Sequence, residues 1–262
     1  MLEARSVTSK VILQLVTTIM IIPFAVPLYV MFSGSFAGQG WGNYRAVFRV
    51  PNLLGYFRNS ILIAAATVAI VYVLTMMAAF GFSKLRIRSK EVFFWMMMAA
   101  LTLPEVVLLA PLFTTVAKLG ISGTLWSVIL PISALQVPFT VLLTRTYVNG
   151  IPDALFEAAR IDGASTWRCF IHILVPLAKP IAVAVIVFVM INAWNSYLLP
   201  LVFLTGDHAG VVTLLPQHFQ GQYNDDQTKV LAGAVITALP EVVAYISLQK
   251  YFERGMAAGA LK

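Results

Sequence analysis

The chain has 262 residues, of which 60% are hydrophobic and only 11% are charged. Soluble globular domains carry about 25% charged residues, so this composition excludes an ordinary soluble domain and indicates an integral membrane protein. The net charge of +7 does not indicate nucleic-acid binding, because the cations are spread over short segments and are not gathered on one face among aromatic residues.

Six apolar runs along the chain are long enough to cross a membrane. They cover about residues 11–33, 59–83, 91–117, 124–147, 181–199 and 229–252. The third run is expected to be broken by Pro104 and Pro111, and the fourth by Pro131 and Pro138. The first run is predicted to be a retained span and not a signal peptide, because it exceeds a typical signal core and no small-residue cleavage site follows directly. Residues 34–58 and 200–228 are expected to be loops, the second of them mostly polar.

The distribution of cations predicts which side of the membrane each connecting segment occupies. All but five of the 18 Lys and Arg residues fall in segments on the same side as the N terminus; the exceptions are Arg45, Arg49, Arg58, Lys118 and Lys229. Short cytoplasmic segments are enriched in cations. Both termini, and the polar block of residues 149–180, are therefore predicted to be cytoplasmic.

The block of residues 149–180 is polar and charged in a chain otherwise suited to hydrocarbon. We expect two short helices, with Pro152 at the first position of one and Ser165 capping the other. Gly163 is expected to end the first helix in a left-handed conformation, and Pro176 to end the second. The i, i+3, i+4, i+7 spacing in the second helix predicts one apolar stripe, formed by Trp167, Phe170, Ile171 and Leu174.

The same block contains a long spaced pattern. The letters EAA at residues 157–159 are followed after three residues by Gly163 and, nine residues later, by ILVP at residues 173–176. This pattern resembles the EAA loop of ABC importer permeases, in which leucine usually stands at the position of Val175. The segments WGNYRAVF, PLFTTVAKLGISGTLW, AWNSYLLPLVFLT and LQKYFERGMAAGALK also resemble carbohydrate-uptake permeases of the maltose type, in their smaller six-helix subunit.

The resemblance implies an all-α integral membrane protein with the six transmembrane helices and cytoplasmic coupling helices of the type I ABC importer permease fold. Residues 1–262 would form one transmembrane permease domain in the inner membrane, and half of a path for a di- or oligosaccharide. The implied partners are a second permease subunit, two ATPase subunits that bind ATP and Mg, and an extracytoplasmic sugar-binding protein. The chain has no GxxxxGK[ST] sequence, so we expect neither a cofactor nor enzyme activity in this subunit.

Three groups of residues are expected to carry this function. Those implied to couple to the ATPase subunits are Glu157, Ala158, Ala159, Asp162, Gly163 and Trp167. Those expected to contact the binding protein are Gln217, Phe219 and Tyr223. Carboxylates inside a membrane are costly and normally face protein or a water-filled cavity, so Glu105 and Glu241 are expected on the substrate path. Asn192, Trp194 and Asn195 are expected there too, because the resemblance places the fifth span near the path. No metal site is expected from Cys169 and three histidines in separate segments.

Other interpretations stay open on the sequence alone. A secondary transporter would also have intramembrane carboxylates and broken helices, and LPEVV does occur twice, at residues 103–107 and 239–243. The coupling pattern argues against it, because such a transporter needs no ATPase-docking loop. A related permease could carry a non-sugar solute such as glycerol phosphate. The two acids could also lie at span ends and pair with cations of a partner subunit, with the asparagines joining helices.

Overall fold

A computed structural model of the chain describes residues 7–204, 210–221 and 226–260, with side chains described as far as residue 247. The regular elements in these ranges are all helical. The chain divides into two compact units, one formed by residues 1–51 and 215–239, the other by residues 52–214 and 240–262. Each unit is described by itself.

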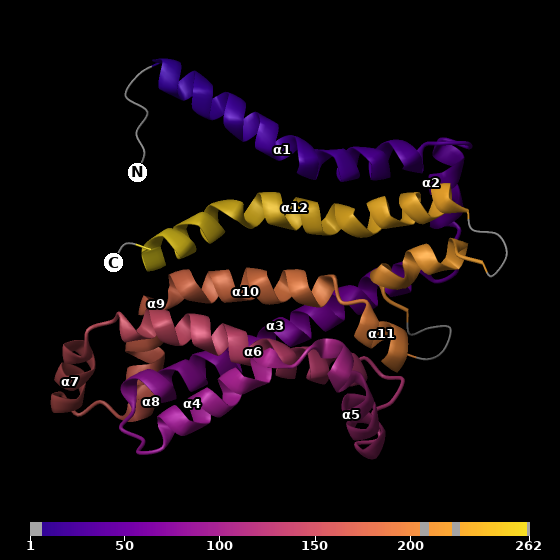
Figure 1. The fold of residues 1–262 in the computed structure, drawn as a ribbon. Helices are drawn as coiled ribbons and strands as arrows, with labels where there is room; N and C mark the ends of the chain where they lie inside the picture. The colour runs from indigo at the N-terminus through magenta and orange to yellow at the C-terminus, as the bar shows by residue number, and fades with distance from the viewer. Residues whose placement is uncertain (1–6, 205–209, 222–225, 261–262) are drawn as a thin grey trace. The chain divides into compact units, whose positions relative to one another are not determined.

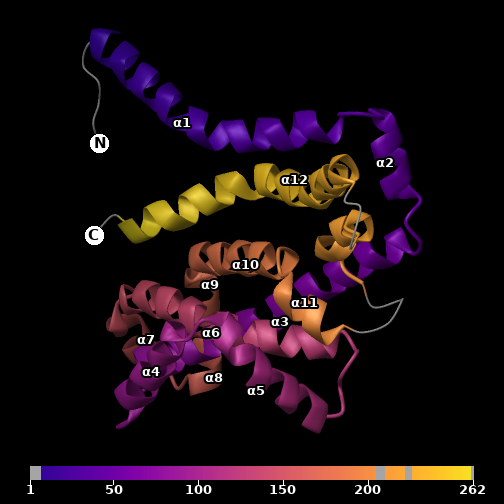
Figure 2. The ribbon, with the colours of Figure 1, turned by 45° about the vertical axis from the view of Figure 1, so that its right-hand side comes forward.

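The larger unit is organised around α3 (Leu53–Lys84), a helix of 32 residues that packs against α6 (Trp126–Asn149) and α10 (Lys179–Trp194). Figures 1 and 2 show these three helices side by side. Successive buried apolar clusters along α3 contain Ile63, then Val71, then Phe80. Small residues let membrane helices approach closely, and Ala64 and Ala79 of α3 are both buried. The helix therefore contributes to the core along its length.

Proline disturbs these helices less than expected. Pro131 and Pro138 both lie inside α6, which is continuous, so the prediction that they interrupt the fourth span is wrong. Each proline removes one backbone hydrogen bond, and the packing of α6 against α3 and α10 maintains the helix around these gaps. Pro111 likewise lies inside α5 (Glu105–Lys118) and does not break it.

The third predicted span is sharply bent. It consists of α4 (Lys90–Ala99), the short 3-10 helix η1 (Ala100–Thr102) and α5, and the two halves meet at 108°. The break at Pro104 is confirmed: Leu103 has an extended backbone, as the residue before a proline prefers. Figures 1 and 2 show α5 turned across the direction of α6. This segment is a broken span or a re-entrant loop, and not one straight helix.

The segment after α10 also differs from the prediction. The fifth span ends at Trp194 and not at residue 199, and α11 (Leu198–Phe203) and the 3-10 helix η3 (Val212–Phe219) follow. Leu199, Phe203 and Val212 are buried. The expected polar loop is thus partly helical, because its apolar residues pack against the core instead of facing water.

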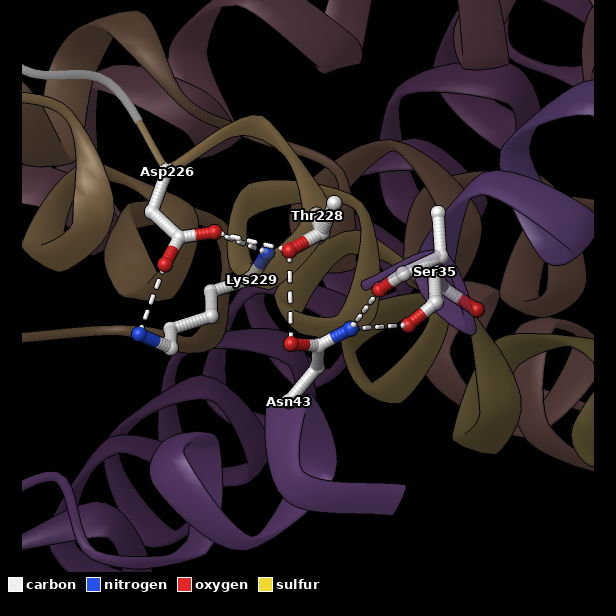
Figure 3. A network of polar contacts seen from close by, with 6 residues as sticks. Ser35, Asn43, Asp226, Thr228 and Lys229 are labelled. Atoms are coloured by element: carbon white, nitrogen blue, oxygen red, sulfur yellow. Dashed lines mark hydrogen bonds and ion pairs between the residues drawn. The ribbon is translucent and has the colours of Figure 1, made fainter. Parts of the chain in front are cut away.

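The smaller unit contains α1 (Val7–Ser35), α2 (Trp41–Phe48) and the start of α12 (Gln227–Ala260). α2 lies in a region expected to be a loop. The buried side chain of Asn43 donates to the carbonyl oxygens of Ser35 and Ala37, at 2.9 and 2.8 Å. It also accepts from Thr228 Oγ1 at 3.3 Å, and Figure 3 shows it between Ser35 and Thr228. One amide thus joins the end of α1, α2 and the start of α12.

The lengths of the helices agree with a membrane protein. Among the described residues, four helices are long and apolar enough to cross a bilayer: Thr8–Ser35, Leu53–Lys84, Trp126–Asn149 and Gln227–Ser247. Two bent pairs, within residues 90–118 and 166–194, bring the number to six if each pair is one span. The predicted all-α membrane fold of six spans is consistent with this arrangement.

Candidate functional site

The first helix of the polar block is α7 (Asp153–Ile161), and local chemistry explains both of its ends. Pro152 is the N-cap and not the first helical residue as predicted. At the other end Gly163 has φ 78°, its N–H donates to Arg160 O at 3.0 Å, and Ala164 N–H donates to Ala159 O at 2.8 Å. This is a Schellman motif, in which a left-handed glycine allows two free carbonyl groups to be satisfied. The predicted break at Gly163 is confirmed.

The second part of the block runs through α8 (Thr166–Cys169), the π-helix η2 (Phe170–Leu174) and α9 (Val175–Leu177). Ser165 Oγ accepts a hydrogen bond from Arg168 N at 3.3 Å, which confirms the predicted cap. Pro176 does not end the helix; the 77° bend lies after Leu177, where α10 begins. A proline lacks an N–H and crowds the carbonyl four residues earlier, and the wider π turn just before it accommodates this.

The predicted apolar stripe is only half correct. Phe170 and Leu174 are buried, but Trp167 and Ile171 are 58% and 39% exposed, and Cys169 takes a buried position in their place. A π turn holds more residues than an α turn, so the i, i+3, i+4, i+7 positions no longer share one face through η2. Trp167 stacks on Phe170 with ring centroids 5.1 Å apart and leaves much of its surface open.

The block exposes large apolar side chains next to the predicted coupling residues. Ile161 is 86% exposed, Trp167 58% and Leu155 46%. Of the predicted residues, Ala159 is half-buried and the others are exposed. We call this the coupling surface, formed by Leu155, Glu157, Ala158, Ile161, Asp162, Gly163 and Trp167. Exposed apolar groups clustered on a polar segment are typical of a surface that another protein covers.

Lys84, the last residue of α3, holds α7 in place. Its ammonium donates to Ile151 O and to Asp153 Oδ1, both at 2.6 Å, and its side chain is only 3% exposed. The hydrogen bond and the charge of Lys84 lower the pKa of the Asp153 carboxyl below its ordinary value of 3.8. At the other end of α7, Arg160 Nη2 donates to Lys84 O at 3.3 Å. Sequence reasoning counted Lys84 only as a cytoplasmic cation and missed this role.

An aromatic cluster completes the attachment. Phe156, the buried residue of α7, lies 6.1 Å from Phe80 of α3 between ring centroids, and Phe80 lies 5.5 Å from Phe170 of η2. The Lys84 ammonium is 5.3 Å from the centroid of Phe156, within cation–π range. Both helical parts of the block are thus fixed to one end of α3.

Three of the five predicted substrate-path residues lie together. Asn195 Nδ2 donates to Glu241 Oε1 at 2.7 Å. Trp194 and Glu241 line a cavity of about 290 Å³ between α3, α10 and α12, with Met190, Ile191 and Pro240 beside them. Glu241 is the one charged residue in a lining that is otherwise apolar, and small-molecule sites are usually apolar with a small number of polar groups.

The other two path residues are placed differently. Asn192 Nδ2 donates to Phe188 O of its own helix at 2.9 Å, and Asn192 does not line the cavity. Glu105 is the exposed first residue of α5 and does not line it either.

The predicted binding-protein residues lie at η3. Gln217 and Phe219 are half-buried, and Phe219 O accepts from Asp226 N at 3.1 Å, which closes the connection to α12. Tyr223 lies outside the described residues.

Residues 72–258 match the family described as binding-protein-dependent transport system inner membrane component. The probable ABC transporter permease protein YurM of Bacillus subtilis is 32% identical over 79% of this chain and 69% of its own length. The melibiose/raffinose/stachyose import permease protein MelC of the same organism is 26% identical over the full length of both. The diacetylchitobiose uptake system permease protein NgcG of Streptomyces coelicolor is 27% identical, covering 92% of this chain and 77% of its own.

A solved structure has the same fold. It is a chain of a bacterial ABC transporter that imports the acidic polysaccharide alginate, with a TM-score of 0.77 and 22% identity, covering 95% of this chain and 99% of that one.

Proposed function

The chain belongs to the family of binding-protein-dependent transport system inner membrane components, and on this premise we propose that it is the permease subunit of an ATP-driven sugar importer. In this proposal residues 1–262 act as one permease domain in the inner membrane, with both termini cytoplasmic. The chain forms half of the translocation path, and a second permease subunit forms the other half. Two separate ATPase subunits bind ATP and Mg, and an extracytoplasmic binding protein delivers the sugar.

The coupling surface is the observation that carries this proposal. Ile161 and Trp167 are more than half exposed on a segment rich in polar and charged residues, while Phe156 of the same segment is buried. An isolated chain would gain by burying these apolar groups, so their exposure favours a protein partner. The small Ala158 and the turn at Gly163 leave room for close contact. We assign the partner as the ATPase subunit because the EAA pattern lies on this surface.

The cavity supports a sugar as the transported solute. Glu241 and Trp194 both line it: Glu241 offers a carboxylate to hydroxyls, and Trp194 offers an aromatic face to the apolar side of a sugar ring. Relatives named for melibiose, raffinose, stachyose and diacetylchitobiose transport agree with this class of solute. Membership in a family that depends on binding proteins argues against the secondary-transporter alternative.

A charge placed in the coupling surface tests the proposal. Ile161→Glu should insert in the membrane at normal levels but fail to copurify with the ATPase subunit, because a carboxylate would be buried in an apolar contact. Ile87→Glu is the matched control, since Ile87 is 46% exposed on the segment between α3 and α4. Normal ATPase binding by Ile161→Glu would show that this surface does not dock the ATPase.

A further inference from the structure

α3 is the one long helix that no proline interrupts among the described residues. The other helices of more than 20 residues, α1, α6 and α12, contain Pro23 and Pro27, Pro131 and Pro138, and Pro240. Proline removes a backbone hydrogen bond and kinks or loosens a helix. The unbroken hydrogen-bond ladder of α3 makes it the stiffest long element of the larger unit.

At one end, α3 is hydrogen-bonded to α7 and to the segment just before it through a single residue, Lys84. The Lys84 side chain holds the start of α7 at Ile151 O and Asp153, and the Lys84 carbonyl accepts from Arg160 in its last turn. A helix of nine residues is about 13 Å long. Because one residue of α3 contacts both ends of α7, α7 cannot rotate or slide against α3 without breaking at least one of these bonds.

At the opposite end, α3 is hydrogen-bonded to the segment where η3 begins. Asn59 Nδ2 donates to Gly210 O at 3.0 Å, and Ser60 Oγ accepts from Val212 N at 3.0 Å. Asn59 and Ser60 are both buried. A Cβ on Gly210 would clash with the Tyr56 ring, so this segment lies directly against α3.

We propose that α3 is the mechanical link between the ATPase-docking helix and the extracytoplasmic segment, with Lys84 and Ser60 as the positioning residues at its two ends. The inference rests on the proposed function, which supplies the ATPase on one side and the binding protein on the other. The 24 positions between the two residues correspond to about 36 Å of helix. A movement of α7 therefore displaces the segment at residues 210–212 through α3. In the other direction, contact of that segment with the binding protein displaces α7.

The test measures ATPase stimulation in the reconstituted complex with the sugar-loaded binding protein. Lys84→Met and Ser60→Ala should each assemble and keep basal ATPase activity, but lose at least about fivefold of the stimulation, the lower end of typical coupling between sites. The double variant should lose no more stimulation than the more severely affected single variant, because both changes break the same connection. A structural role alone would instead lower assembly and basal activity together.

Two control variants test whether the loss of stimulation is specific to the ends of α3. One changes the middle of the helix, and the other removes a nearby cation. Thr75→Val removes the 2.7 Å hydrogen bond to Thr140 in the middle of α3, and should keep full stimulation. Arg86→Met removes an exposed cation next to Lys84 and should also keep it. If Lys84→Met does not assemble, the exposed Arg160 provides a second variant. Arg160→Gln removes the guanidinium that donates to the Lys84 carbonyl, and full stimulation in this variant would overturn the inference.

A distance measurement tests stiffness directly. Spin labels at Leu62 and Met77, both 47% exposed on α3, should lie about 22 Å apart by helix geometry. The distance should be the same in the resting and ATP-bound complex, whereas a change of about one helical turn, 5.4 Å, would overturn the inference.

The outcomes also distinguish the two proposals. If the wild-type chain binds no ATPase subunit, the proposed function fails, and the inference falls with it. If the wild-type complex transports sugar but Lys84→Met and Ser60→Ala keep full stimulation, or if their effects multiply, only the role of α3 is overturned.

Discussion

Asn195 donates a hydrogen bond to Glu241 over 2.7 Å and so joins the end of α10 to α12, 46 residues further along the chain. Both residues were expected on the substrate path, but nothing in the sequence indicated that they bond to each other. An intramembrane carboxylate is stable only with partners or water. The amide supplies one partner, and Glu241 lines the cavity together with Trp194.

Glu241→Gln should change sugar affinity without disturbing assembly. The amide keeps the size and can still bond Asn195, but it loses the charge that strengthens bonds to hydroxyls. We expect the half-saturating sugar concentration for uptake to shift by roughly two- to tenfold, equivalent to about 0.5–1.5 kcal/mol. Val243→Ala, at an exposed position of α12 outside the cavity, is the control. Reduced assembly with unaltered affinity would instead indicate a structural pair.

The loss of transport caused by substitutions at Gly163 should increase with the backbone strain that each new residue introduces. Its φ of 78° is left-handed, which costs other residues about 1–2 kcal/mol and β-branched residues more. Gly163→Val should therefore insert in the membrane but lose transport, measured as sugar uptake against protein level. Gly163→Asn should retain most of it, because Asn tolerates this conformation. Normal uptake by Gly163→Val combined with Glu157→Ala would refute the coupling role of this turn.

The parts of the site that sequence predicted are those fixed by local chemistry. The left-handed turn at Gly163 and the Ser165 cap depend on residues within one or two turns, so the pattern identified them. The attachment by Lys84 depends on contacts with residues 67 to 76 positions away, and a cation at a span end gives no signal of its partner. The prediction of an apolar stripe through Trp167 was half wrong because it used α-helical spacing, whereas η2 is π-helical.

The same distinction applies to the spans. Apolar runs predicted where helices lie, because hydrocarbon requires continuous apolar stretches. Pro104 predicted a break in the third span, but neither its 108° angle nor the continuity of α6 through Pro131 and Pro138 was predicted. Those outcomes depend on packing between helices, which composition does not encode.

Asn43→Ala should destabilise the smaller unit. The side chain is fully buried and makes three hydrogen bonds that join α1, α2 and α12 (Figure 3). Leaving its partners unsatisfied should cost about 1–3 kcal/mol. The effect is measured as a lower thermal midpoint in detergent, with Gln39→Ala as the exposed control. An unchanged midpoint would show that the network contributes no stability.

Stability should fall at acidic pH in part through Asp226. Hydrogen bonds from Lys229 and Thr228, at 2.6 and 2.7 Å, lower its pKa below 3.8 in the folded chain. A group with a depressed folded pKa stabilises above its unfolded pKa of about 3.9 and loses this contribution as pH falls through the folded value. Asp226→Asn should therefore flatten the dependence of the thermal midpoint between about pH 5 and pH 2. Equal slopes in the two proteins would exclude this contribution.

Site-specific cross-linking shows whether the coupling surface docks an ATPase subunit. A photoreactive amino acid at Ile161 or Trp167 should capture the ATPase subunit in the assembled importer, whereas one at Leu54, which is 84% exposed at the other end of α3, should not. Capture from both positions of the coupling surface is the predicted result. If the importer takes up sugar while neither position captures the ATPase subunit, the coupling surface does not dock it.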